Sequence, residues 1–226
     1  MGGEPELALL LHIFPEGLEE LDGAYAVYAD EPPLGFDVVE VDDVVEGWED
    51  GWRAFHRGVR VGRLWVGPPW EEPAADVTPV VIDPGRAFGT GAHATTRLCL
   101  ELLQEVESTS LLDVGCGSGV LSVAAAKLGF APVYAVDIDD VSLETTTANA
   151  AANGVSVDVG AELRPAALAV MNIALDVVER MLPELPVERA ITSGYLERDE
   201  PQIDRWHRLE RRVRDGWAAD LLELRS

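Results

Sequence analysis

The sequence predicts an α/β fold whose main sheet is mostly parallel and ends in an antiparallel hairpin. Strand-length apolar runs alternate with helical segments beyond residue 94, with strands at 110–114, 132–137, 155–159, 167–172 and 188–192 and helices at 94–106, 119–128, 141–152 and 174–182. This alternation is typical of a parallel sheet with helices on both faces. The chain ends differently, because Asp215-Gly216 favours a tight turn between the strand-like segments Leu209–Val213 and Trp217–Leu224. Five strands and the hairpin pair make a predicted sheet of seven strands.

A small α+β domain is expected over residues 1–47, ahead of this main domain at 94–226. Strand-length apolar segments lie at 7–11, 24–28 and 36–41, and a short helix is predicted at 16–21. Prolines and glycines punctuate these segments, as expected of turns. The order of elements predicts a β-α-β-β unit.

Residues 48–93 are expected to form a connector and a signature loop. The stretch is rich in tryptophan, glycine and proline, with a helix predicted at 48–55 and a strand at 63–66. Its tryptophans are interpreted as packing residues. Base or sugar stacking is the alternative, which the acidic surroundings do not favour.

The charge of the chain is strongly negative and unevenly distributed. The 226 residues include 41 acidic and 17 basic ones, a net charge of −24, and residues 1–50 hold fifteen Asp and Glu with no Lys or Arg. Such a surface repels nucleic-acid backbones and anionic membranes and attracts basic partners. Adaptation to a salty cytoplasm is an equally compatible explanation of the acidity.

The sequence predicts a cytoplasmic protein without a metal centre. No apolar run approaches the roughly 18 residues of a membrane span, and no basic residue precedes the first apolar stretch as in a secretory signal. Cys99 and Cys116 form no CxxC or metal-ligand pattern. We therefore expect reduced cysteines.

A glycine-rich loop gives the most specific local motif. The apolar strand Leu111–Val114 runs directly into Gly115-Cys116-Gly117-Ser118-Gly119, which opens the next predicted helix. Glycines let the backbone approach a ligand closely, and open α/β sheets bind ligands at the carboxyl ends of their strands. Val120 stands where the dinucleotide fingerprint needs its third glycine, which disfavours the alternative of a dehydrogenase.

An acidic residue follows the next predicted strand. Asp137 lies 22 residues beyond Gly115, the spacing at which a carboxylate at the neighbouring strand end accepts hydrogen bonds from a ribose diol. Ile138 could lie against a purine face. Alone, Asp137 would be interpreted as a solvated strand-end acid. Asp113 either lies inside the site or braces its loop.

A second glycine-rich segment precedes the helix at 94–106. It runs from Asp83 to Gly91, and His93, Thr95 and Thr96 follow where the helix is predicted to begin. The free N–H groups of a helix start can meet a carboxylate or another polar group. Capping of the helix by the two threonine hydroxyls is the simpler interpretation.

These motifs resemble those of a known enzyme family. The glycine loop together with Asp137 resembles the class I S-adenosylmethionine-dependent methyltransferases, which have a Rossmann-like fold. The string Asp-Pro-Gly-x-Ala-Phe-Gly-Thr-Gly-x-His-x-Thr-Thr at 83–96 resembles the signature of the ribosomal protein L11 methyltransferase family. The match continues through Val136–Asp139, Asn149 to Gly154, Val170–Ile173 and Ser193-Gly194. It covers residue 48 to the end.

The resemblance implies S-adenosylmethionine as the cofactor. Carried over by motif position, the cofactor-binding residues are Phe88, Gly89, Thr90, Thr96, Asp113, Gly115, Gly117, Gly119, Asp137, Ile138 and Asn172. Two departures concern the pocket: the segment 160–167, which usually walls the adenine, is short, and Ala94 replaces a typical proline.

Asn172 and His93 are the predicted catalytic residues. Methyl transfer to nitrogen needs a desolvated amine whose lone pair points at the methyl group, and an Asn carbonyl can accept the amine's N–H. A lysine ammonium must first lose a proton, since its reference pKa is about 10.4. His93 is the candidate base, with a structural histidine as the alternative.

The implied substrate is an amino group, a Lys side chain or an N-terminus, of a basic protein such as ribosomal protein L11. The family uses its N-terminal region to recognise this substrate, and here that unit is short and acidic, which predicts docking of a basic protein. No nucleic-acid or membrane binding is expected. The alternatives are a methyltransferase of the same fold with another protein or small-molecule substrate, and a non-catalytic S-adenosylmethionine-binding module.

Overall fold

The computed structural model describes residues 57–83 and 91–225, together with the backbone of 18–21 and 24–27. The chain divides into two compact units, Met1–Phe55 and His56–Ser226. The division falls inside the segment 48–93 expected as a connector. No helix in the described residues is long and apolar enough to cross a membrane.

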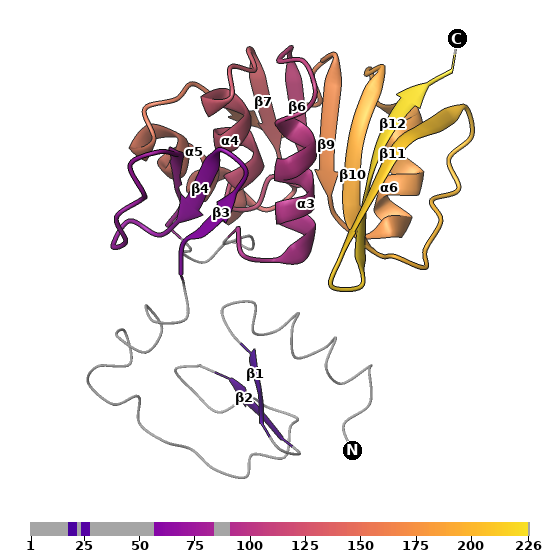
Figure 1. The fold of residues 1–226 in the computed structure, drawn as a ribbon. Helices are drawn as coiled ribbons and strands as arrows, with labels where there is room; N and C mark the ends of the chain where they lie inside the picture. The colour runs from indigo at the N-terminus through magenta and orange to yellow at the C-terminus, as the bar shows by residue number, and fades with distance from the viewer. Residues whose placement is uncertain (1–17, 22–23, 28–56, 84–90, 226) are drawn as a thin grey trace. The chain divides into compact units, whose positions relative to one another are not determined.

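A seven-stranded sheet forms the centre of the second unit, which confirms the predicted fold class (Figure 1). Its strands are β6 (Leu111–Val114), β7 (Val133–Val136), β8 (Asp158–Gly160), β9 (Leu168–Asn172), β10 (Arg189–Leu196), β11 (Trp206–Arg214) and β12 (Trp217–Leu224). The order across the sheet is β11-β12-β10-β9-β6-β7-β8. Strands β6 to β10 pair in parallel, and β12 is antiparallel to both β10 and β11. The predicted Asp-Gly turn joins the last two strands.

Helices cover both faces of this sheet, as the alternating pattern predicts (Figure 1). They are α3 (Ala94–Leu103), α4 (Val120–Lys127), α5 (Asp140–Ala152) and α6 (Leu175–Met181), followed by the short 3-10 helix η1 (Leu182–Glu184). On one face of the sheet, residues of α3 and α4 pack against the strands in a large core that includes Leu98, Leu121 and Ile191. Val178 of α6 packs on the other face against Leu112 and Met171.

A three-stranded sheet packs into the same large core. It consists of β3 (Val59–Val61), β4 (Leu64–Gly67) and β5 (Thr78–Val81), with β4 in the centre, antiparallel to β3 and parallel to β5. Val66, Val80 and Ile82 are buried with Leu98 of α3. The predicted strand at 63–66 is confirmed as β4, whereas β3 and β5 were not predicted. The predicted helix at 48–55 lies outside the described residues.

A two-stranded hairpin is described in the first unit. Strand β1 (Leu18–Leu21) pairs antiparallel with β2 (Ala24–Val27), with Leu21 opposite Ala24. The predicted strand at 24–28 is confirmed, but the predicted helix at 16–21 is wrong. The sequence Asp22-Gly23 joins the two strands, and Asp-Gly strongly favours a two-residue hairpin over a continuing helix. The strands predicted at 7–11 and 36–41 lie outside the described residues.

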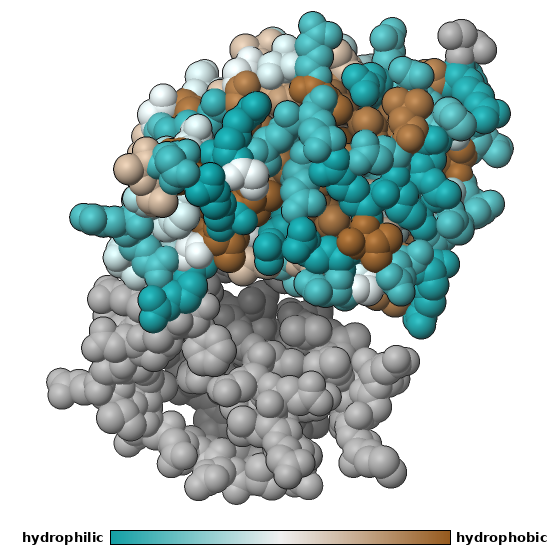
Figure 2. Space-filling view, viewed as in Figure 1, coloured by the Kyte–Doolittle hydropathy of each residue, from teal (hydrophilic) through white to brown (hydrophobic). Residues whose placement is uncertain are grey.

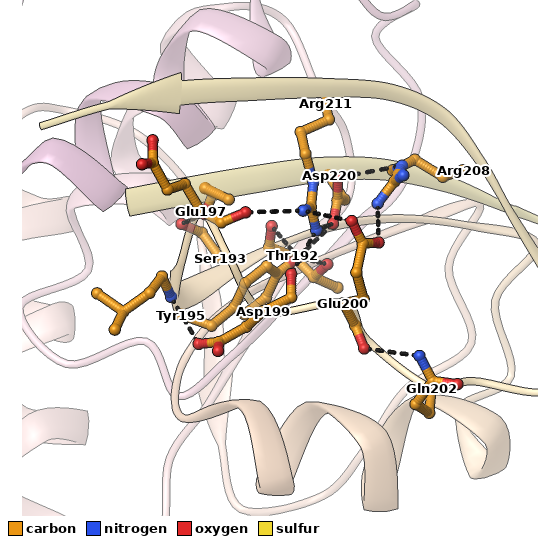
Figure 3. Close-up of polar contacts among 12 residues, drawn as sticks. Thr192, Ser193, Tyr195, Glu197, Asp199, Glu200, Gln202, Arg208, Arg211 and Asp220 are labelled. Carbon is orange, nitrogen blue, oxygen red and sulfur yellow. Dashed lines mark hydrogen bonds and ion pairs between the residues drawn. The ribbon is translucent and has the colours of Figure 1, made fainter. Parts of the chain in front are cut away.

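A buried ion pair holds the antiparallel end of the large sheet together (Figure 3). The Asp220 carboxylate, fully buried on β12, receives bonds of 2.8 and 2.7 Å from Nε and Nη2 of Arg211 on β11. The Tyr195 hydroxyl on β10 donates to the same carboxylate at 3.0 Å. Arg211 also donates to the main-chain oxygens of Glu197 and Asp199. The cluster therefore ties three strands to the segment that follows β10.

Candidate functional site

The glycine loop joins β6 to α4 with a backbone that requires glycine. Gly115, Gly117 and Gly119 have φ of 77°, 53° and 78°, in the left-handed region that side chains disfavour. A Cβ added to Gly115 would lie 2.5 Å from Cγ2 of Ile173, and one added to Gly119 would lie 2.8 Å from Cγ2 of Thr146. The loop is thus closely packed as well as sharply turned.

Asp137 lies beside the glycine loop, as predicted. Its Oδ2 accepts the Gly117 N–H at 2.9 Å, and its Oδ1 accepts the Asp139 N–H at 3.1 Å. The two elements meet because β6 and β7 are parallel neighbours and both end at the same edge, with Val114 opposite Val136. Each carboxylate oxygen has a second lone pair that a hydroxyl can use. Ile138 next to it is fully exposed.

Thr96 and Asn172 are brought together from residues 76 positions apart. The Asn172 side-chain amide, at the end of β9, donates to the hydroxyl of Thr96 on α3 at 3.3 Å. Thr96 is buried, so its position is fixed by the packing of α3. This bond engages the NH₂ group of Asn172, and its carbonyl oxygen can accept an N–H from a substrate.

His93 is the N-cap residue of α3, in place of the two threonine hydroxyls that the sequence favoured. Its Nδ1 accepts from the Thr95 N–H at 3.4 Å and lies 2.8 Å from the Thr95 hydroxyl. The ring meets Trp217 edge-on at 5.0 Å between centroids. Partial burial lowers the pKa of His93, which favours the neutral ring. These contacts give His93 a structural role, and its catalytic role stays a prediction.

Asp113 is a buried carboxyl behind the loop. It accepts the Ser122 hydroxyl of α4 at 2.6 Å. Burial raises the pKa of Asp113 to about 7, an effect that the bond from Ser122 opposes and the nearby charge of Asp137 reinforces. The contact supports the second of the two predicted roles, in which Asp113 braces the loop against the first turn of α4.

Stability is expected to depend on pH through Asp113. In the unfolded chain the carboxyl ionises near the ordinary aspartate pKa of 3.8, whereas the folded protein keeps its proton to about pH 7. Between these values the folded state binds more protons, so the free energy of unfolding falls as pH rises. Asp113→Asn lacks this titration and should gain stability relative to the wild type between about pH 5 and pH 8. Urea unfolding of both proteins at about pH 5 and about pH 8 gives their free energies of unfolding. The same difference between variant and wild type at the two pH values would contradict the prediction.

The two cysteines are free and buried. Burial raises the pKa of Cys116 in the glycine loop to about 12 and raises that of Cys99 further. Both are therefore neutral thiols at neutral pH and poor nucleophiles. In the described residues no group of three or more His, Cys, Asp or Glu could hold a metal ion.

Three predicted site residues, Phe88, Gly89 and Thr90, lie outside the described residues. Other residues at the site were not predicted as functional. Gly194, with φ of 100°, lies so close to the main chain of Ile173 that no Cβ fits there. Thr146 and Asn149 of α5 bond the glycine loop. Asn149 belongs to the motif that carries the resemblance, but its spacing gave no indication of this contact.

Comparison with known proteins agrees with the resemblance. The family described as ribosomal protein L11 methyltransferase (PrmA) matches residues 22–218. The chain is 41% identical over 211 residues to the ribosomal protein L11 methyltransferase of Symbiobacterium thermophilum, covering 84% of this chain and 68% of that protein. A namesake from Legionella pneumophila is 43% identical over 173 residues, covering 70% and 60%.

A solved structure supports the same relation. The crystal structure of the ribosomal protein L11 methylase from Lactobacillus delbrueckii subsp. bulgaricus aligns with a TM-score of 0.64 at 28% identity, covering 76% of this chain and 100% of that one. Against the two curated relatives above, the chain spans 68% and 60% of their length.

Proposed function

This chain belongs to the ribosomal protein L11 methyltransferase family, and from that membership we propose that it transfers methyl groups from S-adenosylmethionine to amino groups of ribosomal protein L11. The observation that carries the proposal is the junction of the glycine loop with Asp137, through a 2.9 Å bond, at the sheet edge where β9 presents Asn172. This arrangement supports binding of a nucleoside beside a group that can orient an amine.

The residues present fit S-adenosylmethionine. Gly115 and Gly119 have no space for a side chain because Ile173 and Thr146 pack against them. The loop turns sharply at the end of β6, and its Gly115 and Gly117 are only partly buried, so the backbone there can approach a ligand. The Asp137 carboxylate retains acceptor capacity for a ribose diol, and the exposed Ile138 offers an apolar contact to a purine. When bound, the cofactor supplies an electrophilic methyl group on a sulfonium centre. Phe88, Gly89 and Thr90 are proposed as further contacts from their motif positions.

Asn172 is proposed to orient the substrate amine. Thr96 fixes its amide group, and the carbonyl oxygen then accepts an N–H of the substrate so that the nitrogen lone pair is directed for in-line transfer. Removal of the amine from water lowers its pKa and favours the neutral nucleophile. His93 is a weaker candidate for a base, because its Nδ1 is already engaged in capping α3.

The direct test is methyl transfer to purified ribosomal protein L11, followed by mass spectrometry. Incorporation of methyl groups is expected with the wild type and should be lost in Asn172→Ala, whose fold should be retained. Radiolabelling of a cell lysate distinguishes other substrates of the same fold. Label in small metabolites alone would contradict the proposed protein substrate.

Substrate affinity is expected to depend on the acidic residues of the first unit. Residues 1–50 carry −15 of the net −24, and long-range attraction accelerates the encounter with a basic protein. Neutralising Glu16, Glu19, Glu20, Asp42 and Asp43 to their amides should raise KM for the protein substrate at low salt. The effect should disappear near 1 M salt, where the screening length falls to about 3 Å.

The matched control neutralises five exposed acids of the second unit. Glu107, Glu184, Glu188, Asp204 and Glu223 are all exposed, and their amides change the net charge of the chain by the same amount. This variant should keep a KM near that of the wild type. Equal effects of the two variants would show that total charge matters and that the first unit is not a docking module.

A further inference from the structure

A polar stripe on α5 faces both the glycine loop and the small sheet. We define it as Thr146 and Asn149 of α5 together with Asn153, the C-cap residue of that helix, at spacings of three and four that place all three on one side. Thr146 and Asn149 are almost completely buried, and Asn153 is partly buried. Burying a side-chain amide or hydroxyl costs free energy unless its hydrogen bonds are satisfied. The hydrogen-bond partners of these three residues therefore indicate their role.

The first two residues hold the carbonyl groups of the glycine loop. The Thr146 hydroxyl donates to the Gly117 oxygen at 3.0 Å, and Nδ2 of Asn149 donates to the Ser118 oxygen at 2.8 Å. Because each peptide unit is planar, holding these oxygens also sets the direction of the N–H groups on the next residues. Thr146 also packs so closely on Gly119 that a Cβ there would lie 2.8 Å away.

The side-chain amides of Asn149 and Asn153 bond the outer edge of β5 and the residues after it, in the way that the main chain of a neighbouring strand would. Oδ1 of Asn149 accepts the Asp83 N–H at 3.0 Å and its Nδ2 donates to the Asp83 oxygen at 3.4 Å. Asn153 does the same for Val81, accepting its N–H at 3.0 Å and donating to its oxygen at 2.6 Å. Alternate residues of an extended segment are thus bonded by two side-chain amides.

Asn149 is the one residue of the stripe that bonds both the glycine loop and the segment that follows β5. It bonds Ser118 in the glycine loop and Asp83 at the end of the extended segment, whereas the contacts of Asn153 are Val81 and the main chain of its own helix. We propose that Thr146 and Asn149 are positioning residues of the cofactor site, which fix the peptide planes of the glycine loop and couple it to the small sheet. This inference rests on the proposed function.

Calorimetric titration with S-adenosylhomocysteine tests the role of Asn149. Asn149→Ala removes the hydrogen bond from Asn149 to the Ser118 oxygen. The dissociation constant of S-adenosylhomocysteine should then rise about tenfold, which corresponds to the free energy of one lost hydrogen bond. Asn153→Ala is the matched control, since it removes an amide from the same helix without touching the loop. Its affinity should change less than about twofold. Titrations are run at a temperature where unfolding curves show every variant fully folded.

Thr146 gives an independent second comparison. Thr146→Val keeps the side-chain shape but removes the donor to Gly117, and should weaken binding about fivefold. Thr146→Ser keeps the hydroxyl and removes only the methyl group, so its affinity should stay near that of the wild type. A purely structural packing role does not predict this difference from Thr146→Val. Wild-type protein that does not bind the ligand would overturn the proposed function and this inference with it. A wild type that binds, with Asn149→Ala and Thr146→Val equal to it or to Asn153→Ala, would overturn the inference alone.

Discussion

Replacing Asp137 with asparagine is expected to weaken S-adenosylhomocysteine binding roughly 100-fold. Bonds to charged acceptors contribute about 1.5–3 kcal/mol each, and about 1.4 kcal/mol corresponds to tenfold in affinity. The carboxylate accepts the N–H groups of Gly117 and Asp139, and an asparagine NH₂ would face one of these donors. The substitution therefore loses a loop anchor together with an acceptor for the ribose.

The control is Asp139→Asn, measured by the same titration. Asp139 is two residues away and caps α5, where its oxygens accept from Val141 and Ser142. Asparagine is an equally good N-cap, so this variant removes the same unit of charge without removing the cap. Its affinity should stay within about threefold of the wild type. Similar losses in the two variants would show that general negative charge, and not the Asp137 geometry, governs binding.

The main sheet was predictable because its elements are long and locally consistent. Each predicted strand from 110 to 192 is confirmed within about three residues at either end, apart from the C-terminal extension of β10 to Leu196. The strands β3 and β5 were missed because three and four residues are too few for a reliable pattern, and because β5 shows no alternation of buried and exposed positions. Their pairing with β4 depends on contacts that local patterns do not encode. The error at 16–21 came from overlooking the Asp-Gly turn.

One part of the site followed from the glycine motif and the sheet topology. Gly115 and Asp137 were predicted as neighbours because parallel strands end at one edge of a sheet. Thr146 and Asn149 were not, since their partners Gly117 and Asp83 lie 29 and 66 residues away. His93 shows a different difficulty: a histidine in a signature loop attracts a catalytic interpretation, whereas the structure shows its nitrogen capping α3.

Asp220→Ala is expected to lower the free energy of unfolding by about 3 kcal/mol. Removing one partner of a buried ion pair costs about 3–5 kcal/mol because the other charge stays buried. Arg211, whose side chain is 15% exposed, would lose both bonds to Asp220, and the Tyr195 hydroxyl would lose one (Figure 3). Arg211 keeps Glu200 at 3.1 Å and two main-chain oxygens, which places the cost at the lower end of the range. Urea unfolding gives the value.

Arg208→Gln is the control, because it removes a charge at the surface from β11, the strand that carries Arg211. Arg208 is 39% exposed, its Nη1 lies 2.5 Å from the exposed Glu200 carboxylate and its Nε lies 3.8 Å from Asp220. The exposed pair with Glu200 contributes below about 1 kcal/mol. The opposite face of the sheet, which carries α3, is mostly hydrophilic with scattered apolar residues (Figure 2). Equal losses in the two variants would show that the buried pair has no special importance.

A larger loss of stability in Asp220→Ala would bear on the site as well, because β10 is bonded to the strand that carries Asn172. The main-chain oxygen of Ser193 on β10, between Thr192 and Gly194, accepts the Ile173 N–H at 3.1 Å. The Asp220 cluster anchors that strand, so loosening it should also displace Asn172.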